Sequence, residues 1–280
     1  MISGLPLVSI ITPVYNGAEF IEELILSVKT QDYPNIEHII LDDGSSDNGA
    51  TVEVLKKYPH LRWWSRPNQG QYATMNDALS SAKGEFVCFV SADDVLLPHA
   101  VKTVVDFLVS HPEADGVFGL TDYMDEQGNL LTLPVLFPQA PFRLIKYFAH
   151  VLHCSFYIKR SCFEQFDLLF DPSLKYAGDY EWMTRMTQYP LKIGRVSQKL
   201  SRIRIHASQT SQLNGSSGLQ EIEGVYKRHK VNIPLRKLAL LVYFFYYRFW
   251  EIGQKYKQGG FGALFAHVSK FLKKFSLVFL

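Results

Sequence analysis

The chain has 280 residues, of which 47% are hydrophobic, 14% aromatic and 20% charged. This composition supplies a large buried core and excludes a disordered or fibrous protein. The longest uncharged apolar stretch, Leu238 to Tyr247, reaches about half of the roughly 20 residues that a membrane-spanning helix needs. Nothing at the start marks the chain for secretion, and the cysteines lack CxxC spacing. We therefore expect a cytoplasmic protein with reduced cysteines.

The formal net charge of +2 is unevenly distributed along the chain. Residues 1–226 carry 18 Lys and Arg against 26 Asp and Glu, whereas residues 227–280 carry 11 against 1. The acidic body argues against a nucleic-acid-binding protein, because phosphate contacts need clustered basic side chains. The basic, aromatic tail favours an anionic surface, most simply a membrane.

The first 120 residues alternate between short apolar runs and amphipathic segments, as parallel strands joined by helices do. The predicted strands are 8–12, 37–41, 61–65, 86–90 and 116–120. The predicted helices are 20–31, 48–58, 71–82 and 98–111. Residues 121–200 are irregular, with a helix expected over 142–153, and we interpret them as an insertion that shapes a pocket. The pattern predicts an α/β fold.

A Gly- and Ser-rich joint at 214–218 predicts a boundary between a domain at 1–213 and a helical tail at 214–280. Within the tail, apolar side chains recur at helical spacing from Phe261 to Phe275, and lysines lie off that face. This pattern is typical of a helix that lies in a membrane interface. The alternative is that the tail helices cover the first domain.

Polar side chains follow three of the predicted strands, at the edge where open parallel sheets bind ligands. The three runs are Thr12–Asn16, Asp42–Asp47 and Ser91–Asp94. There is no GxGxxG motif and no Walker loop, which excludes the usual dinucleotide and P-loop sites. The adjacent carboxylates Asp93 and Asp94 favour a metal ion. The alternatives are that Asp93 or Asp94 caps the helix that begins near Pro98, and that Asp42–Asp47 forms an Asp-Gly turn.

Asn76 lies on the apolar stripe of the predicted helix 71–82, together with Tyr72, Met75 and Leu79. A buried amide needs hydrogen-bond partners, which are most often found within the protein. We keep Asn76 as a candidate for nucleotide binding, with an internal partner as the alternative.

In this order and at this spacing, the motifs resemble the inverting family 2 glycosyltransferases of the GT-A fold. The matching elements are Pro13–Asn16, Asp42–Asp47, Asn68–Asn76, Gly84–Glu85 and Ser91–Asp94. The resemblance covers residue 7 to about residue 205. It implies a Rossmann-like, mostly parallel sheet flanked by helices, a nucleotide-sugar donor, and Mg²⁺ or Mn²⁺.

The resemblance also implies roles for residues on the donor side. Asp43 would contact a uracil ring, and Thr12, Pro13 and Tyr15 would pack against the nucleoside. A carboxylate accepts the N3–H group of uracil, a donor that cytosine lacks, which favours a UDP-linked sugar.

By the same resemblance, Asp93 would hold the ribose and Asp94 the divalent metal. His206 follows Arg204 in an Arg-x-His segment. Such segments stand near the end of related catalytic domains, where the histidine or the arginine reaches the diphosphate or the metal. We therefore count His206 as a second metal-ligand candidate.

The catalytic base implied by the resemblance is Asp179, within the segment Gly178–Trp182. It would accept the proton of an acceptor hydroxyl. The structural alternative is an N-cap for the helix that follows. Glu181 is a weaker second candidate for the base, and His153 lies where the family places acceptor-side residues.

The sequence thus predicts a glycosyltransferase on the inner face of the cytoplasmic membrane, acting on a lipid-linked saccharide in bacterial surface-polysaccharide assembly. Two alternatives stay open. A sugar nucleotidyltransferase of related fold would need a glycine-rich, basic first loop, which 12–17 does not provide. A non-catalytic assembly protein with a silent nucleotide pocket would not need the retained carboxylates.

Overall fold

The computed structural model describes residues 4–131, 140–148, 151–209, 215–232, 234–235 and 237–238. The predicted tail helices lie outside these residues, apart from Leu238. The chain separates into two compact units, Met1–Val231 and Asn232–Leu280. Within the part of the chain that the structure describes, no helix is long and apolar enough to cross a membrane.

The first half of the chain alternates strands and helices, as its hydrophobic periodicity predicts. The strands are β1 (Val8–Val14), β2 (Ile36–Asp42), β3 (Arg62–Ser65), β4 (Phe86–Phe89), β5 (Val95–Leu96) and β6 (Gly116–Met124). The helices are α1 (Ile21–Lys29), α2 (Ala50–Lys56), α3 (Gln71–Ser81) and α4 (Ala100–Ser110). Every strand and helix predicted before residue 121 is confirmed, with small differences at the ends.

The second half holds shorter helices and the strands that complete the sheet. The strands are β7 (Leu130–Leu131), β8 (Phe156–Lys159) and β9 (Ile193–Arg204). The helices are η1 (Phe142–Leu144), α5 (Ile145–Phe148), η2 (His153–Ser155), α6 (Ser161–Phe166), α7 (Gly178–Met186) and α9 (Gly215–Arg228). The single helix predicted over 142–153 is wrong at its end, because Leu152 has an extended backbone and His153 starts a separate 3₁₀ turn.

The strands form one curled sheet in the order β3-β2-β1-β4-β8-β6-β9-β5, with β7 paired to β6. Strands β3, β2, β1 and β4 run parallel, and β6 runs parallel to β9. Strand β8 lies between β4 and β6 and is antiparallel to both. The carboxyl ends of β1 and β2 are level, because Val14 pairs with Asp42.

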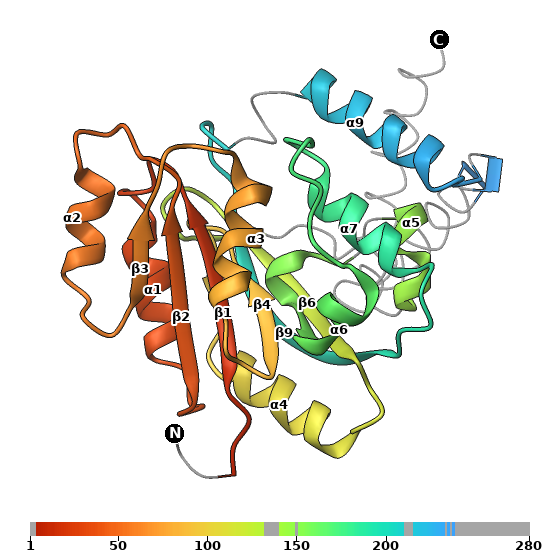
Figure 1. Ribbon diagram of the computed structural model, residues 1–280, viewed down its shortest axis with the longest axis horizontal. Helices are drawn as coiled ribbons and strands as arrows, with labels where there is room; N and C mark the ends of the chain where they lie inside the picture. The colour runs from red at the N-terminus through yellow and green to blue at the C-terminus, as the bar shows by residue number, and fades with distance from the viewer. Residues whose placement is uncertain are drawn as a thin grey trace, which may run out of the picture. The chain divides into compact units, whose positions relative to one another are not determined.

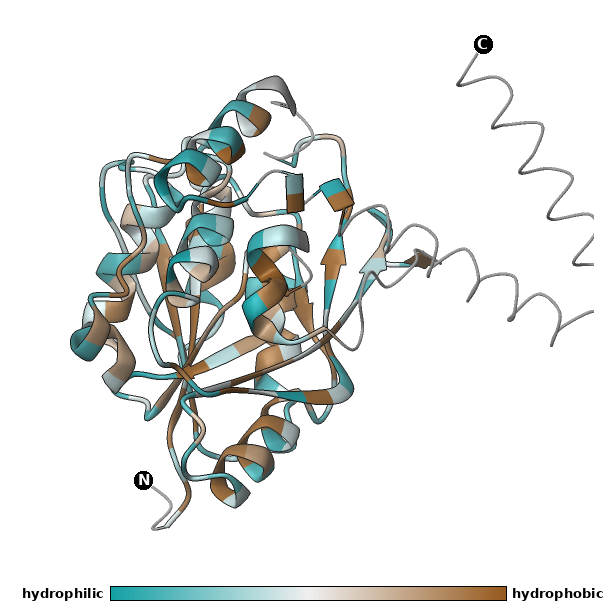
Figure 2. Ribbon diagram, turned by 90° about the vertical axis from the view of Figure 1, so that its right-hand side faces the viewer, coloured by the Kyte–Doolittle hydropathy of each residue, from teal (hydrophilic) through white to brown (hydrophobic). Residues whose placement is uncertain are grey.

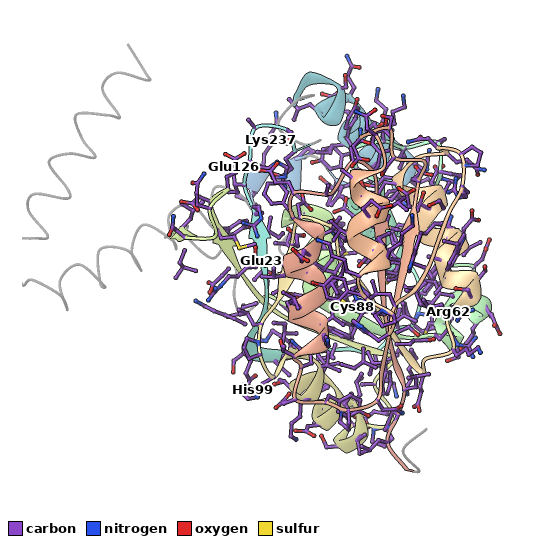
Figure 3. The ribbon with its side chains drawn as sticks, turned by 90° about the vertical axis from the view of Figure 1, so that its left-hand side faces the viewer. Glu23, Arg62, Cys88, His99, Glu126 and Lys237 are labelled. Carbon is purple, nitrogen blue, oxygen red and sulfur yellow. The ribbon has the colours of Figure 1, made fainter. Side chains whose placement is uncertain are left out.

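Helices cover both faces of the sheet, which explains why its first strands are apolar without interruption. In β1, Val8 and Ile10 face a core formed with α1 and α4, whereas Ile11 faces a second core formed with α3, α6 and α7. Figure 1 shows these helices around the sheet, and Figure 2 shows hydrophobic residues concentrated on the inner strands. Cys88, on β4, is buried in the interior (Figure 3). The expected α/β fold is confirmed.

Helix α9 belongs to the first compact unit, which runs to Val231 and so passes the boundary expected at residue 213. Polar contacts fasten this helix to the segment around α7. Arg228 forms an ion pair with Asp171, and His229 contacts Glu181. The Gly- and Ser-rich start of α9 is therefore a helix start within this unit.

Candidate active site

The loops after β1 and β2 are joined to each other at the carboxyl edge of the sheet. The Asn16 amide donates to Ser45 Oγ at 2.8 Å, and the Ser46 amide donates to Asn16 Oδ1 at 2.7 Å. Asn16 adopts a left-handed backbone with φ +51°, which asparagine tolerates better than most residues. These hydrogen bonds fix the two loops, which contain the polar runs after β1 and β2, relative to each other.

Asp43 lies at the centre of this edge and is buried. Its carboxylate accepts hydrogen bonds from the backbone amides of Gln69 at 3.0 Å and Gly70 at 2.9 Å, and it pairs with Arg66 at 2.9 Å. Gly44 allows the close approach of the loop at 66–68, because a Cβ there would lie 2.9 Å from the Arg66 carbonyl oxygen. The Asp43 carboxylate is thus fixed in place, as recognition of a base edge requires.

The structure separates the three predicted residues of the first strand end. Thr12 is fully buried and its Oγ1 lies 3.1 Å from His38 Nε2, so its side chain contacts the neighbouring strand and does not face the ligand edge. Pro13 is also buried. Tyr15 is 50% exposed, with its hydroxyl 3.2 Å from Ser46 Oγ. Of the three, Tyr15 is the side chain that a nucleoside can reach.

Asn76 finds its partners inside the protein. Its Nδ2 donates to the Phe170 carbonyl at 2.9 Å, and its Oδ1 accepts from the Phe170 amide at 2.9 Å. The amide thereby fastens the segment before α7 to α3, the structural role that the sequence left open as the alternative to nucleotide binding.

Asp93 and His206 lie together although 113 positions separate them in the chain. His206 Nε2 is 3.0 Å from Asp93 Oδ2, and His206 Nδ1 is 2.8 Å from Ser208 Oγ. The His206 ring also packs on Phe20, with centroids 4.8 Å apart. An open pocket of about 390 Å³ lies beside it, lined by residues 125–127 and 205–207.

Asp94 faces the interior, whereas Asp93 keeps 24% of its side chain exposed. Asp94 Oδ1 accepts the Arg204 amide at 3.1 Å. Burial, and then the charge of Asp93, raise the pKa of the Asp94 carboxyl well above its usual range. This placement disagrees with the expected division of roles, because it is Asp93 rather than Asp94 that lies beside His206. Neither carboxylate caps α4, whose N-cap residue is His99.

Arg204 is also buried, and its partners explain its position. Its Nε donates to the Asp93 carbonyl at 3.0 Å, and its guanidinium reaches the Glu126 carbonyl and the Glu23 carboxylate. Figure 3 shows Glu23 on α1 and Glu126, which this one side chain connects. Arg204 therefore holds the Asp93 backbone in place.

The pair formed by Asp93 and His206 fits one edge of a metal coordination sphere. Octahedral ligands at about 2.1 Å from Mg²⁺ are about 3 Å apart when adjacent, which matches the 3.0 Å between Nε2 and Oδ2. Among the described residues, no group of three or more His, Cys, Asp or Glu side chains is arranged to hold a metal. A metal here would take its other ligands from the substrate and water, as Mg²⁺ usually does at phosphate sites.

Asp179 lies in the first turn of α7, and Ala177 is the N-cap residue of that helix, with no side-chain capping bond. The Asp179 carboxylate is one third exposed, and its Oδ1 accepts the Tyr180 amide at 2.8 Å. Burial acts to raise the pKa of Asp179, but the contact with His153 and the backbone amides outweigh it and lower the pKa. The side chain is therefore an ionised, partly exposed carboxylate, as a general base must be.

His153 connects Asp179 to the end of β4. Its Nδ1 lies 3.4 Å from Asp179 Oδ2, and its Nε2 lies 3.1 Å from Ser91 Oγ. Ser91 stands two residues before Asp93. A chain of polar contacts thus leads from the strand end that carries Asp93 and Asp94, through Ser91 and His153, to the candidate base Asp179.

Glu181, the second candidate for the base, is buried and fully engaged. It forms an ion pair with Arg185 at 3.1 Å and contacts His229 Nε2 at 2.8 Å. Only 2% of its side chain is exposed, so an acceptor hydroxyl cannot reach it. The geometry favours Asp179.

Helix α9 contributes a contact just before α7 that the sequence did not indicate. The Glu221 carboxylate accepts hydrogen bonds from three successive backbone amides, those of Lys175 at 2.9 Å, Tyr176 at 2.8 Å and Ala177 at 2.9 Å. Gly178 follows, and a Cβ there would lie 2.4 Å from the Tyr72 ring of α3. The start of α7 is therefore fixed by α9 on one side and by α3 on the other.

The sequence analysis did not identify Arg66 and Glu221, because each of them contacts a segment that is distant in the chain and looks like an ordinary surface charge in the sequence. It included Ser91 in a polar strand end but gave no sign of its contact with His153. The one residue in the sequence that could have pointed to these contacts is His153, because it is a histidine next to apolar residues in the region assigned to the acceptor.

Comparison with known proteins decides the family. The model for glycosyl transferase family 2 matches residues 9–166, more than half of the chain. The chain belongs to glycosyl transferase family 2. The family that its motifs resemble is thereby confirmed.

Two relatives from Rickettsia agree with this assignment. A protein named as an uncharacterized glycosyltransferase from Rickettsia prowazekii is 30% identical over 79% of this chain and 70% of its own length. One from Rickettsia felis is 31% identical over 74% of this chain but only 35% of its own length. The chain thus spans about a third of that relative. The O-antigen biosynthesis protein RfbC of Myxococcus xanthus is 27% identical over 78% of this chain and 17% of its own length.

Among solved structures, TarS of S. aureus in complex with UDP-GlcNAc matches with a TM-score of 0.62 and 24% identity. The match covers 72% of this chain and 60% of that one. TarS in complex with UDP matches with a TM-score of 0.63, over 81% of this chain and 66% of that one. At this identity the likeness concerns the fold, and it confirms the expected GT-A architecture.

Proposed function

We propose that this glycosyltransferase moves a sugar from a UDP-sugar to an acceptor hydroxyl, with inversion at the anomeric carbon and with Mg²⁺ or Mn²⁺ as cofactor. The observation that carries the proposal is a carboxylate–histidine pair just after β4, whose neighbouring residue Ser91 is linked through His153 to an ionised carboxylate. Asp93 and His206 form the pair, and Asp179 is the base.

On the donor side, Asp43 is the residue that reads the base of the nucleotide. Two backbone amides and Arg66 orient its carboxylate, which leaves it poised to accept the uracil N3–H group. Tyr15 offers an exposed ring beside it for packing against the nucleoside. Binding of UDP and of UDP-GlcNAc by the structural neighbour TarS supports a uracil nucleotide.

The metal would be held by Asp93 and His206, while Asp94 accepts the amide of Arg204, whose side chain holds the Asp93 carbonyl. A divalent cation at this position neutralises the charge that develops on the leaving diphosphate. The His206 ring is kept in place by Ser208 and Phe20, so the chain presents a preformed pair of ligands to the donor.

On the acceptor side, Asp179 takes the proton of the acceptor hydroxyl as its oxygen attacks the anomeric carbon. The bond between that carbon and the diphosphate oxygen breaks, and its electron pair leaves with UDP. Attack from the face opposite the leaving group inverts the anomeric configuration.

The acceptor is proposed to be a lipid-linked saccharide at the inner face of the cytoplasmic membrane. The support is the basic, aromatic composition of residues 227–280 and the likeness to an O-antigen biosynthesis protein. Each Lys or Arg near an anionic bilayer contributes about 1 kcal/mol to binding. Several of them would keep the enzyme where such an acceptor resides.

The Asp179→Asn variant tests the assignment, with UDP-GlcNAc and Mn²⁺ as the probe. We expect the thermal shift caused by the probe to equal that of the parent, because the donor residues are untouched. Turnover, measured as release of UDP, should fall by roughly 10² or more, the scale for a lost general base. Glu181→Gln is the matched control on the same helix, and its stability is expected to fall while its turnover per folded molecule is kept. Parent-like turnover in Asp179→Asn would refute the assignment of the base.

A further inference from the structure

His153 lies between the end of β4, which carries Ser91, and the start of α7, which carries Asp179. Only 11% of its side chain is exposed. Its Nε2 lies 3.1 Å from Ser91 Oγ. Its Nδ1 has no hydrogen-bond partner among the described residues and lies 3.4 Å from Asp179 Oδ2. A buried ring nitrogen without a partner is unfavourable, and the Asp179 carboxylate is the acceptor that lies near enough for a small movement to bring the two into a hydrogen bond.

The geometry fixes the roles of the two ring nitrogens. The Asp179 carboxylate can only accept, so Nδ1 carries the hydrogen that faces it. In the neutral ring Nε2 is then the acceptor, and the Ser91 hydroxyl donates to it. Ser91 thereby selects the tautomer and the ring orientation that present a donor to Asp179. Contacts of this kind are often long in an enzyme without substrate and shorten in the loaded state.

We propose that His153, oriented by Ser91, is a positioning residue that holds the Asp179 carboxylate in the rotamer and the ionised form that catalysis needs. This inference rests on the proposed role of Asp179 as the base. It adds a specific function for the residue that links the donor edge of the sheet to the acceptor side.

The environment of Asp179 gives the expected direction of the effect. The titratable groups around it are His153 from η2, Tyr72 from α3 and, further away, Glu221 from α9. Burial raises the pKa of Asp179, and the contact with His153 is the largest effect that opposes it. Without the donated hydrogen bond, the pKa of Asp179 should rise, and the acid limb of the rate profile should move to higher pH.

Two isosteric variants separate the two ring nitrogens. In His153→Asn the side-chain amide stands near the position of Nδ1 and can still donate to Asp179. In His153→Gln the amide stands near the position of Nε2, so it can reach Ser91 but not Asp179. The pKa of Asp179 is measured by ¹³C NMR of the full chain labelled at aspartate carboxyls, with Asp179→Asn to assign the signal. UDP release from UDP-GlcNAc with Mn²⁺ gives kcat and KM.

We expect the pKa of Asp179 to rise in His153→Gln and to stay near the parent value in His153→Asn. The kcat of His153→Gln should fall about tenfold or more with little change in KM for the donor, the sign of a misplaced group in the reaction step. Ser91→Ala should change both quantities in the same direction by a smaller factor. His229→Asn is the matched control, because His229 is a buried histidine that pairs with a carboxylate on the same helix. It should alter stability but not the pKa of Asp179.

An unchanged pKa of Asp179 in His153→Gln would overturn the inference, as would equal effects of His153→Asn and His153→Gln. These results are distinct from a failure of the proposed function. If Asp179→Asn keeps parent turnover, the assignment of the base is wrong, whereas the NMR titration still decides whether His153 controls that carboxylate.

Discussion

At the scale of single residues, His38 places a titratable ring inside the sheet. It is 4% exposed on β2, and its Nδ1 has no hydrogen-bond partner among the described residues. Burial, with a smaller effect from His60, lowers the pKa of His38 from 6.5 to about 3. The ring therefore stays neutral in the folded protein at pH values where it is protonated in the unfolded chain.

Stability should consequently depend on pH through this one residue. A lowered pKa in the folded state means that the unfolded chain binds more protons, so the free energy of unfolding falls as the pH drops below about 6.5. One such group gives a slope of about 1.4 kcal/mol per pH unit. In His38→Gln, whose amide can keep the contact with Thr12, urea unfolding between pH 6.5 and 4.5 should show a slope lower by about this amount. His111→Gln changes an exposed histidine, and its free energy of unfolding should show the same slope with pH as the parent.

A second prediction separates the two neighbouring aspartates. Asp93→Asn removes the charge beside His206, so the affinity for Mn²⁺ in the presence of UDP should fall by roughly tenfold or more, as measured by isothermal titration calorimetry. Asp94→Asn changes a buried carboxyl that faces the interior and accepts the Arg204 amide, so its effect on that affinity should be much smaller. A larger loss of Mn²⁺ affinity in Asp94→Asn than in Asp93→Asn would show that Asp94 is the metal ligand.

At the scale of the elements, the contact between α9 and the segment before α7 fixes the start of the helix that carries Asp179. In Glu221→Ala three backbone amides lose their acceptor, which should lower the free energy of unfolding by about 1 to 3 kcal/mol. Turnover should fall with it, because Asp179 follows this turn directly. Glu223→Ala, at an exposed position on the same helix, is the control for thermal unfolding and UDP release. Equal behaviour of the two variants would show that the contact is unimportant.

The same scale explains what the sequence could predict. Strands and helices before residue 121 follow from hydrophobic periodicity because both faces of the sheet are covered. Strands β8 and β9 were missed: β8 is short and borders two helical turns, and β9 carries Arg195, Lys199 and Arg202, which hide its alternation. The sequence could assign the strand ends to a site, but it could not predict in which direction each side chain points. Thr12 turns into the sheet to meet His38, and Asn76 meets Phe170, 94 positions away.

At the scale of the whole molecule, the first compact unit ends at Val231. A chain of residues 1–231 should melt within a few degrees of the parent and still give a thermal shift with UDP-GlcNAc. A chain of residues 1–213 lacks α9 and its bonds to the segment before α7, so it should melt several degrees lower. Equal melting temperatures of the two truncated chains would contradict this account.

The basic tail supplies the remaining prediction. The full chain should sediment with vesicles that contain anionic phospholipid at low salt, and the 1–231 chain should stay in the supernatant, because the removed residues carry 8 Lys and Arg against 1 Glu and the rest of the chain is net negative. Binding should weaken as the salt concentration rises. If the full chain does not bind such vesicles, the membrane assignment fails.

The position of β8 between β4 and β6 has a consequence for the newborn chain on the ribosome. Strands β1 to β4 emerge first and can pair with one another, but the outer edge of β4 stays open until Phe156–Lys159 has been made. An open strand edge can pair with other chains, and β4 limits that hazard by being only four residues long. Asp43, which we propose to read the nucleotide, can thus be in place early, whereas His206, the partner of Asp93, is made 113 residues after Asp93. The ability to bind a donor should therefore appear late in synthesis and in a single step.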